Sequence, residues 1–485
     1  MEKYDLLING EWLPGESGET FDVINPAREE VVAQCAVATI PETQTALEAA
    51  QTAFESWRYT SARERCEILH LAADLFRERI DRAAELLTLE HGKPLQDSYK
   101  ELKFSADVID YYAEEARRLH GTHFEGDAGP THSFVLKQPI GVVAAITPWN
   151  FPVDLLSWKI GPALAVGCTA VVKPPSQSPL AAIEFMRCFI DAGLPPGVLN
   201  IVMGAGRTVG AELVTNPISR KIAFTGSTET GLWIAQQAAK NLKHVTLELG
   251  GSAPFLVFPD ADLDLAVPQA LRRCFSHTGQ ICISVNRIFV HQDVEQEFTE
   301  RFVDSTKRLR VADGMKVPDA DMGPMIDGAG LQTVLDHLND AVEKGASVLA
   351  GGTKPEGEEF SKGFFFLPTV LTGIDRNMKV MREETFGPLA PISTFNTTDE
   401  AITMANDTPY GLAAYIFTRD LDTAMYAAER VDAGGIGINV NDITDMRGPF
   451  GGRKMSGVGR ELGQPGMDSY LEWKHVRLLR QAPRQ

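Results

Sequence analysis

The chain has 485 residues, of which 44% are hydrophobic and 23% are charged. At roughly 150 residues per domain, this length predicts about three domains and excludes a single small module. The composition is typical of globular proteins and excludes a disordered chain, a collagen-like repeat and a minimal disulfide scaffold. The net charge of −19, with no basic run, argues against a nucleic-acid partner.

The N-terminus lacks the positively charged n-region and the apolar h-region of a signal peptide, and no uncharged apolar run is long enough to cross a bilayer. We therefore expect a soluble, cytoplasmic protein without a membrane partner. The six cysteines have no CxxC spacing, which disfavours a disulfide framework and a zinc site, so we expect no metal. They leave room for a single reactive thiol. They are Cys35, Cys66, Cys168, Cys188, Cys274 and Cys282.

Residues 43–118 have the periodicity of consecutive helices. Leu47, Ala50, Phe54 and Trp57 recur at helical spacing between charged positions, and the pattern continues through the following residues. We expect a helical segment that leads into the rest of the fold.

A loop rich in Gly, His and Thr at 121–131 precedes a segment at 134–139 that is typical of an extended ribbon. The tail at 470–480 alternates like a strand, and we expect it to join this ribbon. Because exposed strand edges suit pairing with another subunit, we interpret residues 119–139 and 467–485 as an oligomerisation ribbon and tail.

From residue 141 to 251, short apolar runs alternate with helical stretches, as in a parallel sheet covered by helices. Pro, Gly or Ser residues follow each apolar run, so loops at the carboxyl ends of the strands would line a nucleotide crevice. The expected strands are 142–147, 169–173, 198–203, 221–225 and 244–249.

A second α/β region is expected over 252–456, with helices near 292–309 and 328–344. The paired glycines Gly250 and Gly251 mark its start, because glycine frees the backbone.

Cys282 follows a turn that contains Gly279, where a thiol can be presented to a cleft; an inert core cysteine is the alternative. Glu248 ends an apolar strand just before Gly250. Burial there would raise its pKa and make it a usable general base, whereas a solvated strand-end carboxylate would have no such role.

Asn150 lies between an aromatic residue and Phe151-Pro152, directly after a buried strand. Its amide could donate to a developing oxyanion, a role whose loss typically costs about 100- to 1,000-fold in rate. A turn-forming Asn is the alternative.

Gly226 and Gly231 flank a strand-to-helix turn that contains Ser227. Backbone N–H groups at the start of the helix could meet a phosphate. The two glycines are five residues apart, which is not the GxGxxG spacing, so a bare glycine-rich turn stays open as the alternative.

Together, these four segments resemble the aldehyde dehydrogenase superfamily over nearly the whole chain. Further similar segments are Lys173-Pro174, Glu383 to Pro388, Asn406 to Leu412 and Pro449 to Gly457. The resemblance implies an α/β fold with a Rossmann-type cofactor domain, an α/β catalytic domain and a small β oligomerisation ribbon. It implies an NAD(P)-binding domain of residues 1–118 and 140–251 and a catalytic domain of residues 252–456.

In that family, the cysteine that matches Cys282 is the nucleophile, and its thiolate adds to the aldehyde carbon. Asn150 and the backbone N–H of Cys282 would form the oxyanion hole. After hydride transfer to NAD(P)+, Glu248 would activate the water that hydrolyses the thioester.

The resemblance also implies a binding site for NADP or NAD. Many NAD-preferring members have Glu at the position of Ser176, where it binds the ribose hydroxyls and would repel a 2′-phosphate. We therefore expect NADP+ to be accepted alongside NAD+. The implied cofactor residues are Thr147, Pro148, Trp149, Lys173, Ser176, Gly226, Ser227, Gly231, Leu249, Glu384 and Phe386.

The chain looks most like the NAD(P)-dependent succinate-semialdehyde dehydrogenase branch, which usually holds the substrate's distal carboxylate with arginines. Here those positions are Trp158 and Ser276, and Trp158 resembles enzymes for neutral aldehydes. His277 or Arg447 could substitute for the arginines, or both could be loop residues that face water. The expected substrate pocket consists of Phe151, Leu155, Trp158, Ile281, Ile283 and Phe450.

The implied reaction is the oxidation of succinate semialdehyde, or a related semialdehyde, to the acid. A dehydrogenase for neutral small aliphatic aldehydes is an alternative, and so is a CoA-acylating enzyme, against which Glu248 argues. A non-enzymatic use of the fold is a further alternative. Asp154 could repel anionic substrates or cap its helix. Family members form dimers or tetramers, so we expect a homodimer or a homotetramer.

Overall fold

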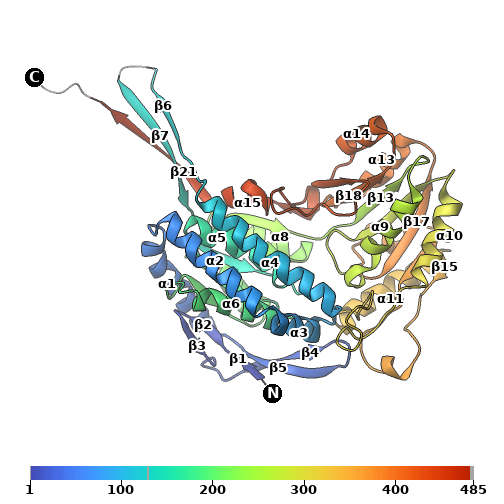
Figure 1. Cartoon of the computed structure of the whole chain (residues 1–485), viewed down its shortest axis with the longest axis horizontal. Helices are drawn as coiled ribbons and strands as arrows, with labels where there is room; N and C mark the ends of the chain where they lie inside the picture. Colours follow the sequence, from blue (N-terminus) through green and yellow to red (C-terminus); the bar gives the residue numbers. More distant parts are fainter. Residues whose placement is uncertain (1, 128–129, 481–485) are drawn as a thin grey trace, which may run out of the picture.

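The computed structural model describes residues 2–127 and 130–480. Two α/β units, each built on a large sheet, form the body of the molecule, and a three-stranded ribbon projects from one end (Figure 1). In the described part of the chain, no helix is long and apolar enough to cross a membrane.

The first unit contains an eight-stranded sheet whose five central strands are parallel, as the sequence predicts. All five predicted strands are present, and the central ones are buried throughout, as is typical of parallel strands covered on both faces. In spatial order the strands are β20 (Gly457–Val458), β12 (His244–Glu248), β11 (Ser219–Thr225), β8 (Val142–Ile146), β9 (Thr169–Lys173), β10 (Leu199–Ile201), β2 (Leu6–Ile8) and β3 (Glu11–Leu13).

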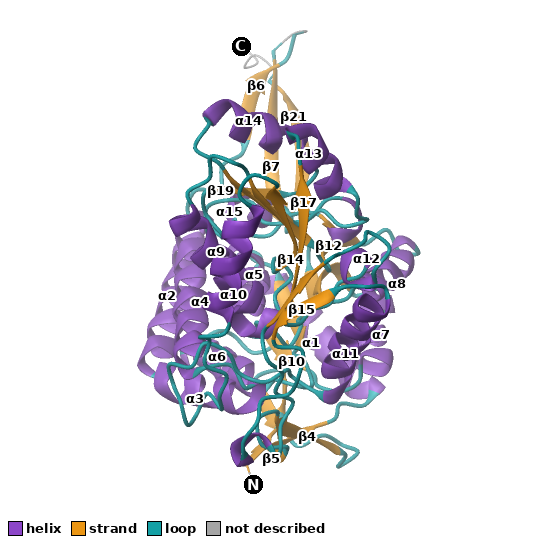
Figure 2. Cartoon of the chain, turned by 90° about the vertical axis from the view of Figure 1, so that its right-hand side faces the viewer, coloured by secondary structure: helices purple, strands orange, loops and turns teal. Residues whose placement is uncertain are grey.

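Helices lie on both sides of these strands (Figure 2). The long segment at 43–118 is helical as predicted, and α4 packs along α5 and α2. The helices of this part of the chain are α1 (Ile40–Trp57), α2 (Ala62–Glu78), α3 (Ile80–His91), α4 (Leu95–Ala116), α5 (Asp154–Val166), α6 (Leu180–Asp191), α7 (Ala211–Thr215) and α8 (Thr228–Ala239).

The second unit contains a seven-stranded sheet in which every pairing except β15 with β16 is parallel. Its strands, in spatial order, are β15 (Ser347–Ala350), β16 (Thr369–Thr372), β17 (Leu389–Phe395), β14 (Val285–His291), β13 (Ala253–Val257), β18 (Ala413–Phe417) and β19 (Gly435–Ile438). Its helices are α9 (Leu263–Phe275), α10 (Glu295–Thr306), α11 (Gly328–Glu343), α12 (Lys379–Arg382), α13 (Thr398–Asn406) and α14 (Leu421–Arg430).

The projecting ribbon consists of β6 (Thr122–Glu125), β7 (Thr131–Pro139) and β21 (Leu471–Leu479). The tail strand β21, which follows the short helix α15 (Gly463–Asp468), pairs antiparallel with β7 along its whole length, from Leu471 opposite Pro139 to Leu479 opposite Thr131. This confirms the predicted pairing of the tail with the ribbon. Residues 128–129 and 481–485, which the sequence analysis placed in the ribbon and tail, lie outside the described residues.

A small sheet near the N-terminus contains β1 (Glu2–Tyr4), β5 (Glu30–Ala36) and β4 (Thr20–Asn25). No strand before residue 40 was predicted from the sequence. β1 to β3 have only three residues each, too few for a period-2 pattern to show, whereas β4 and β5 have six and seven residues.

Candidate active site

Two cavities meet at Cys282. One has a volume of about 410 Å³ and the other of about 300 Å³, and the lining of both includes Cys282 and Leu155. Cys282 is half-buried, whereas the other five cysteines are fully buried. Only one thiol of the chain is therefore accessible from a cavity.

The turn before Cys282 has an unusual backbone. His277, Thr278 and Gly279 have φ angles of 56°, 59° and 71°, in the left-handed region. A Cβ at Gly279 would also overlap the carbonyl of Gly387, so glycine is required there. The buried Gln280 fixes the turn, because its side-chain oxygen accepts from the N–H of Ile326 at 2.9 Å.

Asn150 is buried, and its amide lies against the turn that carries Cys282. Its Nδ2 donates to the carbonyl of Gln280 at 3.0 Å, and its own carbonyl accepts from Lys93 Nζ at 3.0 Å. Asn150 and Cys282 line the same 300 Å³ cavity. The side-chain amide is thus held at one hydrogen and the backbone at its carbonyl, which preorganises the second amide hydrogen for donation toward the cysteine.

Glu248 ends β12 and is buried, and neither of its carboxylate oxygens has a hydrogen-bond partner in the part of the chain that the structure describes. Burial raises the pKa of Glu248 well above its usual range, and the charge of Glu461 raises it further. The raised pKa disfavours the charged carboxylate, and its basic form increases as the pH rises. A buried, unpaired carboxyl group of this kind is typical of a general base.

Lys159 and Glu461 form a fully buried ion pair at 2.8 Å beside Glu248, and Lys159 Nζ also donates to Thr225 Oγ1 at 2.6 Å. The ammonium of Lys159 favours the charged form of Glu248, and Glu461 opposes it. The sequence analysis missed this pair. A lone lysine inside the apolar helix α5 is the signal that could have found it, because a buried charge requires a partner.

The thiol of Cys282 has a raised pKa, first because of burial and then because of the carboxylates of Glu384 and Glu248. The two carboxylates thus lie close enough for their charge to act on the sulfur.

The 300 Å³ cavity contains most of the residues that the sequence analysis assigned to the cofactor. Ser227 caps helix α8, its hydroxyl accepting from the N–H of Thr230 at 3.3 Å, so the helix N-terminus opens onto the cavity. Glu384 accepts from the N–H of Gly251 at 2.9 Å, and burial raises its pKa to about 7. The assigned residues in this lining are Pro148, Trp149, Gly226, Ser227, Leu249, Glu384 and Phe386.

The other four assigned residues lie outside this lining. Gly231 packs against Leu249, and Thr147 has a buried hydroxyl. Ser176 lines a separate cavity of about 510 Å³. Lys173 ends β9 next to Gly210; its Nζ donates to the carbonyl of Pro174 at 3.2 Å, and burial lowers its pKa to about 8.

These groups fit a dinucleotide. The buried ammonium of Lys173 makes one hydrogen bond to the described residues and has further hydrogens to donate. The helix N-terminus at Ser227 suits a phosphate, and the carboxylate of Glu384 suits ribose hydroxyls.

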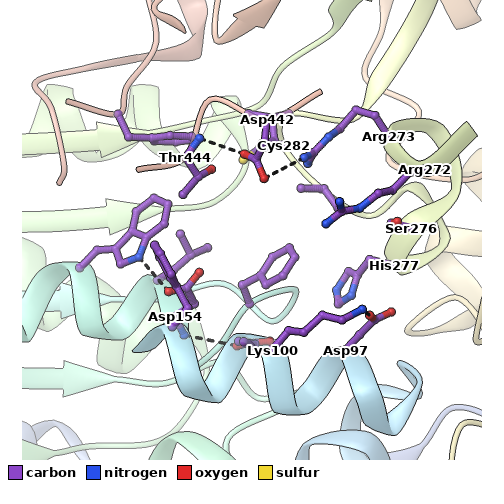
Figure 3. A pocket seen from close by; sticks show the side chains of 18 residues that line it. Asp97, Lys100, Asp154, Arg272, Arg273, Ser276, His277, Cys282, Asp442 and Thr444 are labelled. Carbon is purple, nitrogen blue, oxygen red and sulfur yellow. Dashed lines mark hydrogen bonds and ion pairs between the residues drawn. The ribbon is translucent and has the colours of Figure 1, made fainter. Parts of the chain in front are cut away.

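The 410 Å³ cavity is lined by all six residues that the sequence analysis assigned to the substrate pocket. The rings of Trp158 and Phe450 are 5.0 Å apart in an edge-to-face arrangement. Charged groups that the analysis did not name also line the cavity, among them Lys100, Arg272 and Arg273 (Figure 3).

Comparison with known proteins decides the family. A family model described as "Aldehyde dehydrogenase family" matches residues 12–476. The chain belongs to the aldehyde dehydrogenase family. Its activity is therefore the NAD(P)-dependent oxidation of an aldehyde.

Similar proteins include the NADP+-dependent succinate-semialdehyde dehydrogenase of Escherichia coli, which is 45% identical over 98% of this chain and 97% of that protein. A glutarate-semialdehyde dehydrogenase of Pseudomonas putida is 44% identical with the same coverage of both. A crystal structure described as an E. coli NADP-dependent enzyme matches with a TM-score of 0.96 and 44% identity over 98% of each chain. This confirms the predicted α/β aldehyde dehydrogenase fold.

Neither residue considered as a substitute for the family's carboxylate-binding arginines is suitable. His277 is buried and stacks on Phe151 at 4.5 Å, and burial, with the nearby charge of Lys93, lowers its pKa well below the usual range, so it is neutral. The prediction that it faces water was also wrong. Arg447 is an exposed loop residue that forms an ion pair with Asp445 at 2.8 Å and lies outside the cavity lining.

Asp154 is the first residue of α5, and its side chain makes no cap to the helix backbone. It accepts a hydrogen bond from Trp158 Nε1 at 2.9 Å instead. Burial, followed by the charge of Glu101, raises the pKa of Asp154 well above its usual range. Because the raised pKa disfavours the charged form of Asp154, its repulsion of an anionic substrate is weakened.

Proposed function

We propose that this aldehyde dehydrogenase oxidises succinate semialdehyde, or a related semialdehyde, to the carboxylic acid with NADP+ or NAD+. The position of Cys282 between the two cavities carries this proposal, because one side of the sulfur is open to an aldehyde and the other to the residues that fit a cofactor. Two similar proteins are named for succinate and glutarate semialdehydes.

In the first step, the thiolate of Cys282 attacks the carbonyl carbon of the aldehyde and gives a hemithioacetal. Negative charge develops on the former carbonyl oxygen. The side-chain amide of Asn150, which Gln280 holds at one hydrogen, donates a hydrogen bond to that oxygen and stabilises the charge.

Lys173, Ser227 and Glu384 would hold NAD(P)+, which supplies a hydride acceptor when bound. The thioester that then remains on Cys282 is hydrolysed with help from Glu248. Glu248 takes a proton from water, the water oxygen attacks the thioester carbon, and the acid leaves as the thiol is restored.

Ser176 underlies the proposed use of both cofactors. It replaces the carboxylate that would repel a 2′-phosphate, and it lies three residues after the cationic Lys173. We expect Ser176→Glu to lower the NADP+/NAD+ ratio of kcat/KM by about 10-fold or more, because like charges in contact cost several kcal/mol. Ser176→Ala is the matched control, with a much smaller expected change. An unaltered ratio in Ser176→Glu would rule out this explanation.

The exposed ribbon supports the proposal of a homo-oligomer. Apolar side chains on β7 and β21 are exposed in the single chain, among them Phe134, Leu136, Trp473 and Leu478. Covering them against a second copy would remove this apolar surface from water.

A dehydrogenase for neutral aldehydes is the second candidate. The aromatic wall of Trp158 and Phe450 favours it, because an apolar wall binds an alkyl chain without needing a distal charge.

The two candidates differ in how they treat a substrate carboxylate. We expect kcat/KM for succinate semialdehyde to exceed that for butanal by about 10- to 150-fold, the range of a charge-assisted hydrogen bond of about 1.5 to 3 kcal/mol. Steady-state rates with both aldehydes and both cofactors measure this. Equal or reversed values would favour the neutral aldehyde.

A further inference from the structure

Two arginines near the end of α9 lie one helical turn before Ser276, where the family branch has an arginine. Arg272 and Arg273 are in the last turn of α9, which ends at Phe275, directly before Ser276. Figure 3 shows both side chains at the cavity beside Ser276. The chain thus has guanidinium groups in the same part of the cavity, though they start one turn earlier.

Arg273 is the buried member of this pair, with 7% of its surface exposed. Its Nη2 lies 3.2 Å from a carboxylate oxygen of Asp442, and its Nε has no hydrogen-bond partner among the described residues. A buried cationic donor without an acceptor is costly, and an anionic oxygen that enters the cavity would satisfy it.

Arg273 is also close to the reacting cysteine. Its guanidinium carbon lies 5.9 Å from the ring centre of Tyr415, whose hydroxyl donates to the carbonyl of Ile283 at 3.0 Å, one residue from Cys282. The charge of Arg273 lowers the pKa of Cys282 against the larger opposing effects. A short substrate could therefore reach both groups.

Apart from Arg272, the positive charges of this wall already have partners. Lys100 forms an ion pair with Asp97 at 2.7 Å. Glu101 forms a buried pair with Lys93. Arg272 is exposed, and its side chain has no hydrogen bond or ion pair within residues 2–127 and 130–480. One positive charge at the cavity is therefore unpaired.

We propose that Arg273 binds the distal anionic group of the substrate and that Arg272 adds an unpaired positive charge which attracts it. This inference rests on the proposed function, since it requires a substrate with a carboxylate or a similar anion. In the protein without substrate, a carboxylate oxygen of Asp442 pairs with the guanidinium of Arg273, so Asp442 competes with the substrate for this group.

The first test replaces Arg273 with methionine, which retains an unbranched apolar side chain and removes the charge. The semialdehyde/butanal ratio of kcat/KM should fall by about 10- to 150-fold, mostly through KM for the semialdehyde. Succinate, used as an inhibitor of butanal oxidation, should lose affinity by a similar factor. Arg273→Lys should restore part of the semialdehyde/butanal ratio and part of the affinity for succinate. Thermal melting shows whether each variant folds.

Asp442→Asn separates substrate binding from a structural role. Asp442 uses one oxygen for the N–H of Thr444, at 2.9 Å, and the other for Arg273. Asparagine can keep the first bond while it removes the charge. If Arg273 binds the substrate, this variant should lower KM for the semialdehyde. If Arg273 only holds the loop of Asp442, both variants should raise KM, and the proposal is wrong.

Lys100→Met is the control for loss of a positive charge at the same cavity. The semialdehyde/butanal ratio of kcat/KM in this variant should stay within about twofold of the parent value, because the ammonium of Lys100 is exposed and already paired with Asp97. A parent enzyme without any preference for the semialdehyde would overturn the proposed function. A parent that prefers the semialdehyde, with Arg273→Met keeping that preference, would overturn only the role of Arg273.

Discussion

Replacing Cys282 with alanine is expected to lower kcat for every aldehyde by at least about 10⁴-fold. Without the thiolate no covalent adduct forms, and the other five cysteines are fully buried. Steady-state reduction of NADP+ and NAD+ at saturating aldehyde measures the loss.

Cys274→Ala is the matched control. Cys274 is buried on α9, and burial raises the pKa of its thiol, so it is an inert core residue. This variant should keep activity within a fewfold of the parent and lose about 1 kcal/mol of stability from the small cavity that it creates. Substantial turnover by Cys282→Ala, or its loss in Cys274→Ala, would contradict the assignment of the nucleophile.

Much of the fold could be predicted from local patterns. The strand at 169–173 begins and ends where expected, and the helix expected near 328–344 is α11. The strand is an apolar run and the helix an amphipathic one, and turn residues bound each of them. The signal that predicts them therefore lies in neighbouring positions of the sequence. The strand expected at 198–203 is shorter, at Leu199–Ile201.

The parts of the site that could not be predicted depend on contacts between distant positions. Lys159 and Glu461 are 302 residues apart, and no local pattern pairs them. Arg273 looks like an ordinary charged position of an amphipathic helix, and only the tertiary structure turns it toward the cavity. His277 is the reverse case. A polar residue two positions before a glycine suggests an exposed loop, yet His277 is buried within the left-handed turn.

Replacing Glu248 with glutamine is expected to separate the two halves of the reaction. The first half, up to the thioester, uses Cys282 and Asn150, so it should release about one equivalent of NAD(P)H per site in a rapid burst. Hydrolysis of the thioester then lacks its base, and the steady rate should fall by about 10²- to 10⁴-fold. Rapid mixing with detection of NAD(P)H resolves the two phases.

Glutamine suits this test because it has nearly the shape of glutamate and because the oxygens of Glu248 make no hydrogen bond within the described chain that the change would break. The burst is its own control for folding, since it requires an intact cysteine and a bound cofactor. A variant without either phase would show a collapsed site rather than a missing base.

The pH dependence gives an independent check on Glu248. Its pKa is raised, so the carboxylate base is present above that pKa and is lost as the pH falls. Where hydrolysis limits turnover, kcat of the parent should therefore rise with pH, and Glu248→Gln should lose this rise.

Coenzyme A distinguishes the hydrolytic enzyme from the CoA-acylating alternative. If coenzyme A accelerates the parent and Glu248→Gln turns over normally, the thioester is released to a thiol and Glu248 is not the hydrolytic base.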